Sequence, residues 1–181
     1  TGVTLAGRHD RVEKLVVFGT DRTPREKPLP PPPTLAEIFK LARRRDPRLE
    51  ALARDFIHRQ VPPEAGYPQE TQIARRVAGR MAGYAHPVMT LTGSGNQGIF
   101  IGLPFRRLYA EQGEAILPAV VFALLAQIHL SAKHDRLSAK CGLATKAGPA
   151  LAAGLAFARG AGPADIRRIF REFPARLADL T

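Results

Sequence analysis

The 181-residue sequence contains no tryptophan, only two methionines and a single cysteine, Cys141. One cysteine excludes an intrachain disulfide and predicts an intracellular, cytoplasmic protein. Zinc and iron–sulfur sites typically need three or four protein ligands, and Cys141 has no second thiol in this chain with which to complete one. The sequence also lacks a Walker motif, a His-Glu-x-x-His motif and a Rossmann fingerprint, which argues against the nucleotide sites and zinc proteases that use them.

Long hydrophobic runs and targeting signals are missing as well. The longest apolar run extends from Ala115 to Ala126. It is well short of the roughly 18 residues that a membrane span needs, so it predicts a buried helix. The first residues do not combine a basic segment with an apolar one, and we therefore expect no signal peptide. These features predict a soluble protein without a membrane segment.

Acidic residues are few beside the basic ones: 16 Asp and Glu stand against 27 Lys and Arg, which gives a net charge of +11. Such a balance raises nucleic acid, acidic substrates or an acidic partner chain as binding partners. The arginines come in pairs and triplets, such as 43–45 and 106–107, without a long run. Few aromatic residues lie beside them, so no platform for stacking bases is visible. We therefore favour a solvated basic surface over nucleic-acid binding.

The predicted fold class is α+β and predominantly α, with a compact helical domain, buried Ala/Gly-rich helices and a small N-terminal β element. Residues 3–18 predict two short strands around a turn at Gly7–Asp10. Residues 20–33 form a charged, Pro-rich connector that cannot be helical. We divide the chain into the hairpin with its connector, 1–33, and a helical domain, 34–181, and expect them to form one structural unit.

Helical periodicity covers most of the second region. Thr34 and Glu37 have the spacing of a capping box, and Asp46-Pro47 opens a second helix. A third helix runs from Gln69 to about Tyr84, with its apolar residues on one face. Four more are predicted over residues 99–112, 114–133, 137–159 and 164–180. The helix at 137–159 is so rich in Ala and Gly that it should be buried, because glycine weakens an isolated helix.

Residues 91–99 form a glycine-rich polar turn ahead of a long apolar pattern. Three glycines within six residues let the backbone turn sharply and present several N–H groups in one direction. If a helix begins near Asn96, its unpaired first-turn N–H groups and the positive end of its dipole add to that concavity. The turn is therefore either a structural loop between packed helices or a nest for a carboxylate or phosphate.

The densest group of reactive side chains lies at 133–141 and ends at Cys141. Neighbouring cations and a helix start would favour the thiolate form of Cys141, as a nucleophile or metal ligand. The alternative, which the pattern alone favours, is a buried cysteine packed as a small hydrophobe among alanines. The histidines are scattered, and His129, one helical turn before Lys133, is more typical of a structural role. Ser94 is not in a Gly-x-Ser-x-Gly elbow, so a serine hydrolase is not predicted.

Two motifs together resemble a known family. They are Pro87-Val-Met-Thr-Leu-Thr-Gly-Ser-Gly-Asn-Gln-Gly-Ile99 and, further along, Arg136-Leu-Ser-Ala-Lys-Cys-Gly142. Both are similar to segments of the L-cysteine desulfidase family, which is related to the catalytic alpha chain of iron–sulfur L-serine dehydratase. Gly7-Arg-His9 and the last helix are similar too, so the resemblance extends over essentially the whole chain.

The resemblance implies a lyase that removes the β-substituent of L-cysteine or L-serine and releases pyruvate and ammonia. In such enzymes a four-iron four-sulfur cluster on three cysteines keeps one iron open as a Lewis acid for the leaving group. By the resemblance, Cys141 is one cluster ligand, and no residue is identified as the base. The residues that it places around the substrate carboxylate are Ser94, Gly95, Asn96, Gln97, Arg136 and Ser138.

The chain departs from the family pattern in its cysteines, because the segments that carry the other two ligands are not present. We therefore expect the chain alone to bind no cluster and to lack activity until a second polypeptide or another copy completes the site. The alternative belongs to a different class: a degenerate, non-catalytic relative that acts as a scaffold or as a basic protein binding nucleic acid or an acidic partner.

Overall fold

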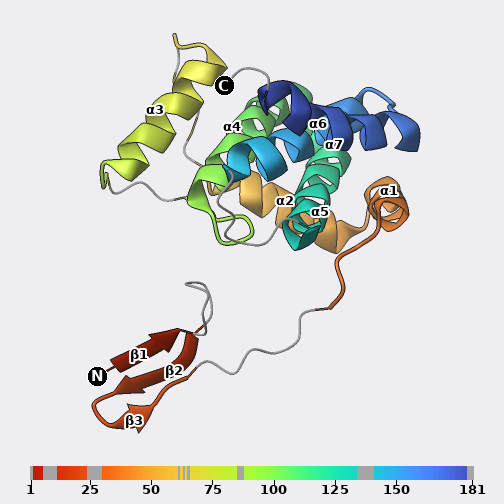
Figure 1. The fold of residues 1–181 in the computed structure, drawn as a ribbon. Coiled ribbons are helices and arrows are strands. Elements are labelled where there is room, and N and C mark those ends of the chain that lie inside the picture. Colours follow the sequence, from red (N-terminus) through yellow and green to blue (C-terminus); the bar gives the residue numbers. More distant parts are fainter. Residues whose placement is uncertain are drawn as a thin grey trace. The chain divides into compact units, whose positions relative to one another are not determined.

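The computed structural model describes residues 2–5, 12–23, 30–60, 62, 64, 66–84, 88–133 and 141–178. Its elements in chain order are β1 (Gly2–Leu5), β2 (Val12–Val17), β3 (Thr20–Asp21), α1 (Leu35–Arg44), α2 (Pro47–His58), α3 (Gln69–Met81), α4 (Gly95–Gln112), η1 (Gly113–Ile116), α5 (Leu117–Lys133), η2 (Leu143–Ala147), α6 (Gly148–Ala158) and α7 (Pro163–Ala178). A predominantly helical chain with a small sheet confirms the predicted α+β class (Figure 1). The chain divides into two compact units, Thr1–Pro31 and Pro32–Thr181, which are described separately.

The first unit contains an antiparallel sheet with strand order β1-β2-β3. Val3 lies opposite Leu15, and the register shifts between Thr4 and Leu5. The two predicted strands are confirmed, and the predicted turn between them lies outside the described residues. The third strand is a correction, because residues 20–21 were assigned to the connector. Phe18 and Gly19 both have positive φ, 49° and 79°, which is the geometry of a two-residue hairpin turn.

Two capped helices begin the second unit, as their sequences predict. The Thr34 side chain accepts a hydrogen bond from the Glu37 backbone N–H, and the Glu37 carboxylate accepts one from the Thr34 N–H at 2.7 Å. The hydrogen bonds that the Thr34 N–H and hydroxyl donate to the Glu37 carboxylate lower the pKa of that carboxyl. Asp46 caps α2, where Pro47 occupies the first turn. A capping interaction of this kind contributes about 1 kcal/mol to helix stability.

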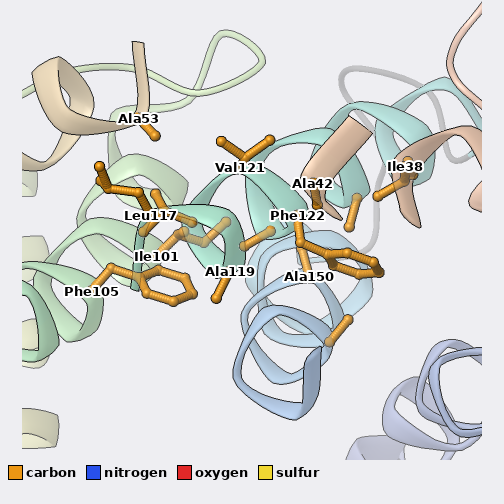
Figure 2. Packing of buried hydrophobic residues seen from close by; sticks show 14 of the residues in the cluster. Ile38, Ala42, Ala53, Ile101, Phe105, Leu117, Ala119, Val121, Phe122 and Ala150 are labelled. Atoms are coloured by element: carbon orange, nitrogen blue, oxygen red, sulfur yellow. The ribbon is translucent and has the colours of Figure 1, made fainter. Parts of the chain in front are cut away.

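Helix α5 is the centre of the hydrophobic core and packs against α1, α2 and α6. Phe122 and Val120 are completely buried on it. Figure 2 shows Phe122 beside Ala150 of α6 and Ala42 of α1. The Phe122 ring meets Phe39 edge-on, with 4.9 Å between ring centroids, and stacks on Phe157 at 4.7 Å. The predicted buried helix is therefore confirmed, and three helices contribute aromatic side chains to one cluster.

The Ala/Gly-rich segment is buried as expected, but it is not one regular helix. It begins with the π-helical turn η2 and continues as α6, in which Ala150 and Ala153 are completely buried. At Gly154 an added Cβ would lie 2.7 Å from Cβ of Ala123 and 2.9 Å from the Ala119 carbonyl oxygen. Glycine is thus what lets α5 and α6 approach so closely. Residues 137–140 of the predicted helix lie outside the described residues.

Residues Gly95–Lys133 form a helical stretch that is long and apolar enough, by length and composition alone, to cross a membrane. It consists of two helices separated by a 3-10 turn at Gly113–Ile116, and most of its apolar part is buried within the protein. Burial of this extent is typical of core helices.

The predicted third helix is confirmed as α3, which ends at Met81 where the sequence predicted an end near Tyr84. None of its residues is buried, and Met81, on the predicted apolar face, is exposed. In the described part of the chain α3 packs against α4, whereas α1, α2, α4 and α6 contact α5, and α7 packs against α6. Arg80 and Met81, in the last turn of α3, contact the side chain of Asn96 at the start of α4.

Candidate functional site

The glycine-rich segment forms a tight turn that leads directly into α4. Leu91 and Ser94 pair through two backbone hydrogen bonds of 3.1 and 3.2 Å. The two residues between them, Thr92 and Gly93, both have positive φ, 50° and 85°. This left-handed conformation is costly for threonine, which has a branched Cβ. The Thr92 hydroxyl is in contact with buried polar side chains of α5, described below, so the strained residue serves a polar cluster.

Ser94 caps α4, which begins at Gly95, four residues before the helix predicted over 99–112 and one before the start near Asn96 that the anion nest requires. Its Oγ accepts a hydrogen bond from the Gln97 N–H at 3.4 Å, and its carbonyl oxygen accepts one from the Gly98 N–H at 3.2 Å. In the described part of the chain, no acceptor pairs with the backbone N–H groups of Gly95 and Asn96. A helix start with free N–H groups attracts anions. The geometry is therefore compatible with the anion nest that the sequence left as one of two alternatives.

A buried polar cluster lies on the inner side of this helix start. It joins Gln97 to three other residues, Thr92, Gln127 and Ser131. The Gln127 amide nitrogen donates to the Gln97 side-chain oxygen and, at 3.2 Å, to the Thr92 hydroxyl. The Ser131 hydroxyl lies 3.2 Å from that of Thr92. Gln127 is completely buried, yet its Oε1 has no partner within the described residues.

The second sequence motif meets this cluster through Gln97. A Cβ added at Gly142 would lie 2.3 Å from the Gln97 side-chain nitrogen, so the amide of Gln97 occupies the space that a side chain at 142 would need. The adjacent residue, Cys141, is exposed, which contradicts the expectation of a cysteine buried among alanines. Its carbonyl oxygen accepts hydrogen bonds from the N–H groups of Ala144 and Thr145 at 3.1 and 3.2 Å. The two motifs are therefore neighbours in the fold, with an accessible thiol at their junction.

Arg80 reaches the outer side of the same helix start. Its Nη1 donates a 3.0 Å hydrogen bond to Oδ1 of Asn96. A Cβ added at Gly95 would lie 2.6 Å from Nε and 3.0 Å from Cζ of Arg80. The guanidinium thus lies against Gly95 and adds a full positive charge to the partial charge of the helix terminus.

A buried lysine follows the cysteine. Lys146 is 1% exposed and belongs to the π-helical turn η2, which packs against α4, α5 and α7. Lys146 lies one helical turn after Gly142, the residue that faces Gln97. Single π turns recur at functional sites, and a buried ammonium is costly unless it is partnered. The turn therefore has the features of a functional segment.

Two predicted site residues, Arg136 and Ser138, lie outside the described residues. His129, a further candidate, is away from the turn: its Nδ1 lies 2.8 Å from the carbonyl oxygen of Pro33. Burial lowers the pKa of His129, and this hydrogen bond opposes the change. His129 thus links α5, to which it belongs, to the residues before α1, which agrees with a structural role.

Comparisons with known proteins bear on this geometry. The family described as "Serine dehydratase alpha chain" matches residues 38–171, which include the turn, the buried polar cluster and Cys141. The chain belongs to the serine dehydratase alpha chain family. This confirms the expected relationship to the alpha chain of serine dehydratase. No solved structure matches the chain.

Family relatives match part of the chain. The chain is 36% identical over 104 residues to a UPF0597 protein of Oleidesulfovibrio alaskensis, a match that covers 56% of this chain and 24% of that protein. It is 33% identical over 110 residues to a UPF0597 protein of Thermosipho africanus, covering 60% of this chain and 27% of that protein. The chain spans about a quarter of the length of these relatives.

The family relationship raises an iron–sulfur cluster as a cofactor, and the residues present do not fit one by themselves. Such clusters are held by three or four cysteine thiolates, whereas the 181 residues contain Cys141 alone. Within the described residues no three His, Cys, Asp or Glu side chains form a group that could hold a metal ion. Any cluster at Cys141 would need thiolates from outside this stretch.

Sequence reasoning missed the residues that surround the turn. Gln127 and Ser131 had a visible signal, because they are polar residues four positions apart in an otherwise apolar helix. Lys146 had a similar one, as the one charged residue between Cys141 and Ala158 in the Ala/Gly-rich segment. Arg80 had none: one arginine among three in α3 cannot be related to Gly95 without the packing of α3 on α4.

Proposed function

We propose that this chain forms the substrate-binding part of a lyase that eliminates the β-substituent of L-serine or L-cysteine, with pyruvate and ammonia as products. The single observation that supports it is the junction of the two family motifs, where Gln97 of the α4 start lies against Gly142, next to the exposed Cys141. A carboxylate at the α4 start would accept hydrogen bonds from the backbone N–H groups of Gly95 and Asn96.

The assignment of residues follows from this arrangement. Ser94, Gly95, Asn96 and Gln97 bind the carboxylate, and Cys141 is the one thiolate that this stretch contributes to a metal centre. Arg136 and Ser138 remain proposed members of the same pocket on the basis of the family resemblance. The lyase is favoured over a basic nucleic-acid-binding protein because several of the surface arginines are paired with carboxylates. Ion pairs with acidic side chains engage Arg45, Arg54, Arg59, Arg76, Arg107, Arg168 and Arg171.

Binding of L-serine should protect Cys141 from alkylation. We expect iodoacetamide to modify the exposed thiol, and saturating L-serine to slow that reaction severalfold, because a ligand on Gly95–Gln97 lies beside residues 141–142. Mass spectrometry of the modified protein against time measures the rate. N96A should lose most of the protection, whereas Q112A, which removes an exposed amide at the other end of α4, should keep it. Equal rates with and without L-serine would count against the proposed site.

The purified chain by itself should release neither pyruvate nor sulfide. One cysteine cannot hold a cluster, so the chemistry requires thiolates from outside these 181 residues. A coupled pyruvate assay and a sulfide assay, with L-serine and L-cysteine as substrates, check this expectation under anaerobic conditions. Turnover by the chain without any partner would contradict the need for a complementing chain while leaving the substrate site itself in place.

A further inference from the structure

The side-chain amide of Gln97 has different surroundings at its two ends. Its Oε1 accepts a hydrogen bond from the buried amide nitrogen of Gln127 on α5. Its Nε2 is the atom nearest to the position that a Cβ at Gly142 would take, whereas Oε1 is 4.0 Å from that position. The carbonyl end of the amide therefore faces α5, and the NH2 end faces the segment that carries Cys141.

The NH2 end of Gln97 is a donor without an acceptor in the described part of the chain. Gln97 is only 8% exposed. An unpaired donor in a side chain so largely buried costs free energy, because it has given up hydrogen bonds to water. A group of this kind in a folded protein needs an explanation, and an acceptor on a bound ligand supplies one. This observation concerns a side-chain donor and is independent of the dipole of α4.

Gln127 holds the amide of Gln97 in its orientation. An amide nitrogen carries two hydrogens, and the nearest acceptors of Nε2 of Gln127 are Oε1 of Gln97 and, at 3.2 Å, the hydroxyl of Thr92. Ser131 donates to the same hydroxyl at 3.2 Å and thereby fixes it. The two ends of an amide have nearly the same shape, so hydrogen bonding decides which end of Gln97 faces Gly142.

Gln127 is an expensive residue for its place in the core. It is completely buried in an apolar part of α5, and its Oε1 has no partner among the described residues. An apolar side chain of similar size would fill the same space without leaving an acceptor unpaired. What glutamine adds is a donor directed at Oε1 of Gln97. Its retention is therefore explained by the orientation that it imposes on Gln97.

We propose that Gln127 is a positioning residue for the ligand site: it fixes the amide of Gln97 so that the NH2 group faces Gly142 and donates to an acceptor of the bound ligand. In the opposite orientation Gln97 would present its carbonyl oxygen, which repels an anion. Gln127 thus makes this part of the site select an acceptor. That the acceptor is the carboxylate of an amino acid rests on the proposed function, whereas the orientation of the amide rests on its contacts with α5 and Gly142.

The orientation is measured first on the ligand-free 181-residue chain, labelled with ¹³C and ¹⁵N for NMR. We expect a nuclear Overhauser effect between the side-chain NH2 protons of Gln97 and the Hα protons of Gly142, because the Gln97 nitrogen lies against Gly142. Q127M and Q127L retain an apolar side chain in the core but remove the donor, so the amide can turn over and this signal should weaken. Q60M is the matched control: Gln60, just after α2, is also buried, and its Nε2 has no partner within the described residues. Thermal unfolding verifies that each variant is folded.

Titration with L-serine then measures the effect on binding. The wild-type chain and Q60M should have equal affinity, and Q127M and Q127L should bind about 10-fold more weakly, because a hydrogen bond to a charged group is lost. Q97M removes the donor itself and should weaken binding to a similar extent. The double variant Q97M/Q127M should bind no more weakly than Q97M, since Gln127 then has no amide left to position. A merely structural contribution of Gln127 would instead add to the loss in Q97M.

The outcomes separate the positioning role from the proposed substrate. Wild-type affinity for L-serine in Q127M and Q127L overturns the role of Gln127 and leaves the amino-acid site standing, as do additive losses in Q97M/Q127M. A wild-type chain that lacks the nuclear Overhauser effect overturns the proposal without any variant. An effect that depends on Gln127, in a chain that does not bind L-serine, supports the positioning of the amide and overturns the proposed substrate.

Discussion

Replacing Phe122 by alanine should lower the free energy of unfolding by about 3–5 kcal/mol, the largest loss expected for a single substitution in this chain. Phe122 is completely buried at the centre of the core on α5 (Figure 2). Alanine would remove its contacts with Phe39 and Phe157, from α1 and α6, and would open a cavity that the surrounding helices can only partly close. Urea unfolding of the wild-type chain and F122A, with the slope checked to be unchanged, measures the difference.

Two variants make this experiment decisive. F122L retains most of the buried volume and should cost less than about 1.5 kcal/mol, because hydrophobic replacements of similar size are tolerated. L52A removes a side chain that is 61% exposed on α2 and should change stability by no more than about 0.5 kcal/mol. A loss below about 1 kcal/mol for F122A would mean that α5 is not the centre of the core.

Much of the fold was predictable because local chemistry specified it. The capping box at Thr34 and the Asp46-Pro47 helix start depend on neighbouring residues alone, and both are confirmed. The core helix at 117–133 follows from the length of its apolar run. Strand β3 and the π turn η2 were missed because two-residue strands and single wide turns leave almost no periodic signal.

Two features could not be predicted, for a different reason: the exposure of α3 and the identity of the residues that surround the polar turn. Helical periodicity identifies an apolar face but not whether a neighbouring element covers it, and Met81 of α3 remains 69% exposed. Likewise, the two motifs predict a turn and a thiol separately. Their contact depends on Gly142 having no side chain where the Gln97 amide lies, which is a property of tertiary packing.

The polar turn contains two features that each lower the stability of the folded chain. Thr92 has a positive φ, and Gln127 is a buried amide with an unpartnered oxygen among the described residues. Natural sequences retain such costs mainly where they serve function. Here both costs fall within one cluster at the start of α4, next to the segment that carries Cys141. The arrangement therefore agrees with a site whose polar groups are held in place before a ligand binds.

Gly98 lets α4 pack against this turn, and we expect it to tolerate substitution less than any other residue of the site. A Cβ at Gly98 would lie 2.0 Å from the carbonyl oxygen of Met89 and 3.7 Å from the Leu91 nitrogen. Both atoms belong to the backbone, so no side-chain rotation relieves the overlap. Although alanine is favoured over glycine within a helix by about 1 kcal/mol, we expect G98A to lower the free energy of unfolding by about 2 kcal/mol, because the overlap outweighs that preference.

Alanine at Gly79 provides the matched control for this prediction. Gly79 lies within α3, where the nearest atom to an added Cβ is in the side chain of Tyr84, at 3.1 Å. An exposed side chain can move, so G79A should leave stability unchanged or raise it by up to about 1 kcal/mol. Urea unfolding measures both variants. Because the overlap displaces the turn that precedes Ser94, G98A should also abolish the protection of Cys141 by L-serine, and a stable G98A chain that retained this protection would show that the ligand does not bind at the α4 start.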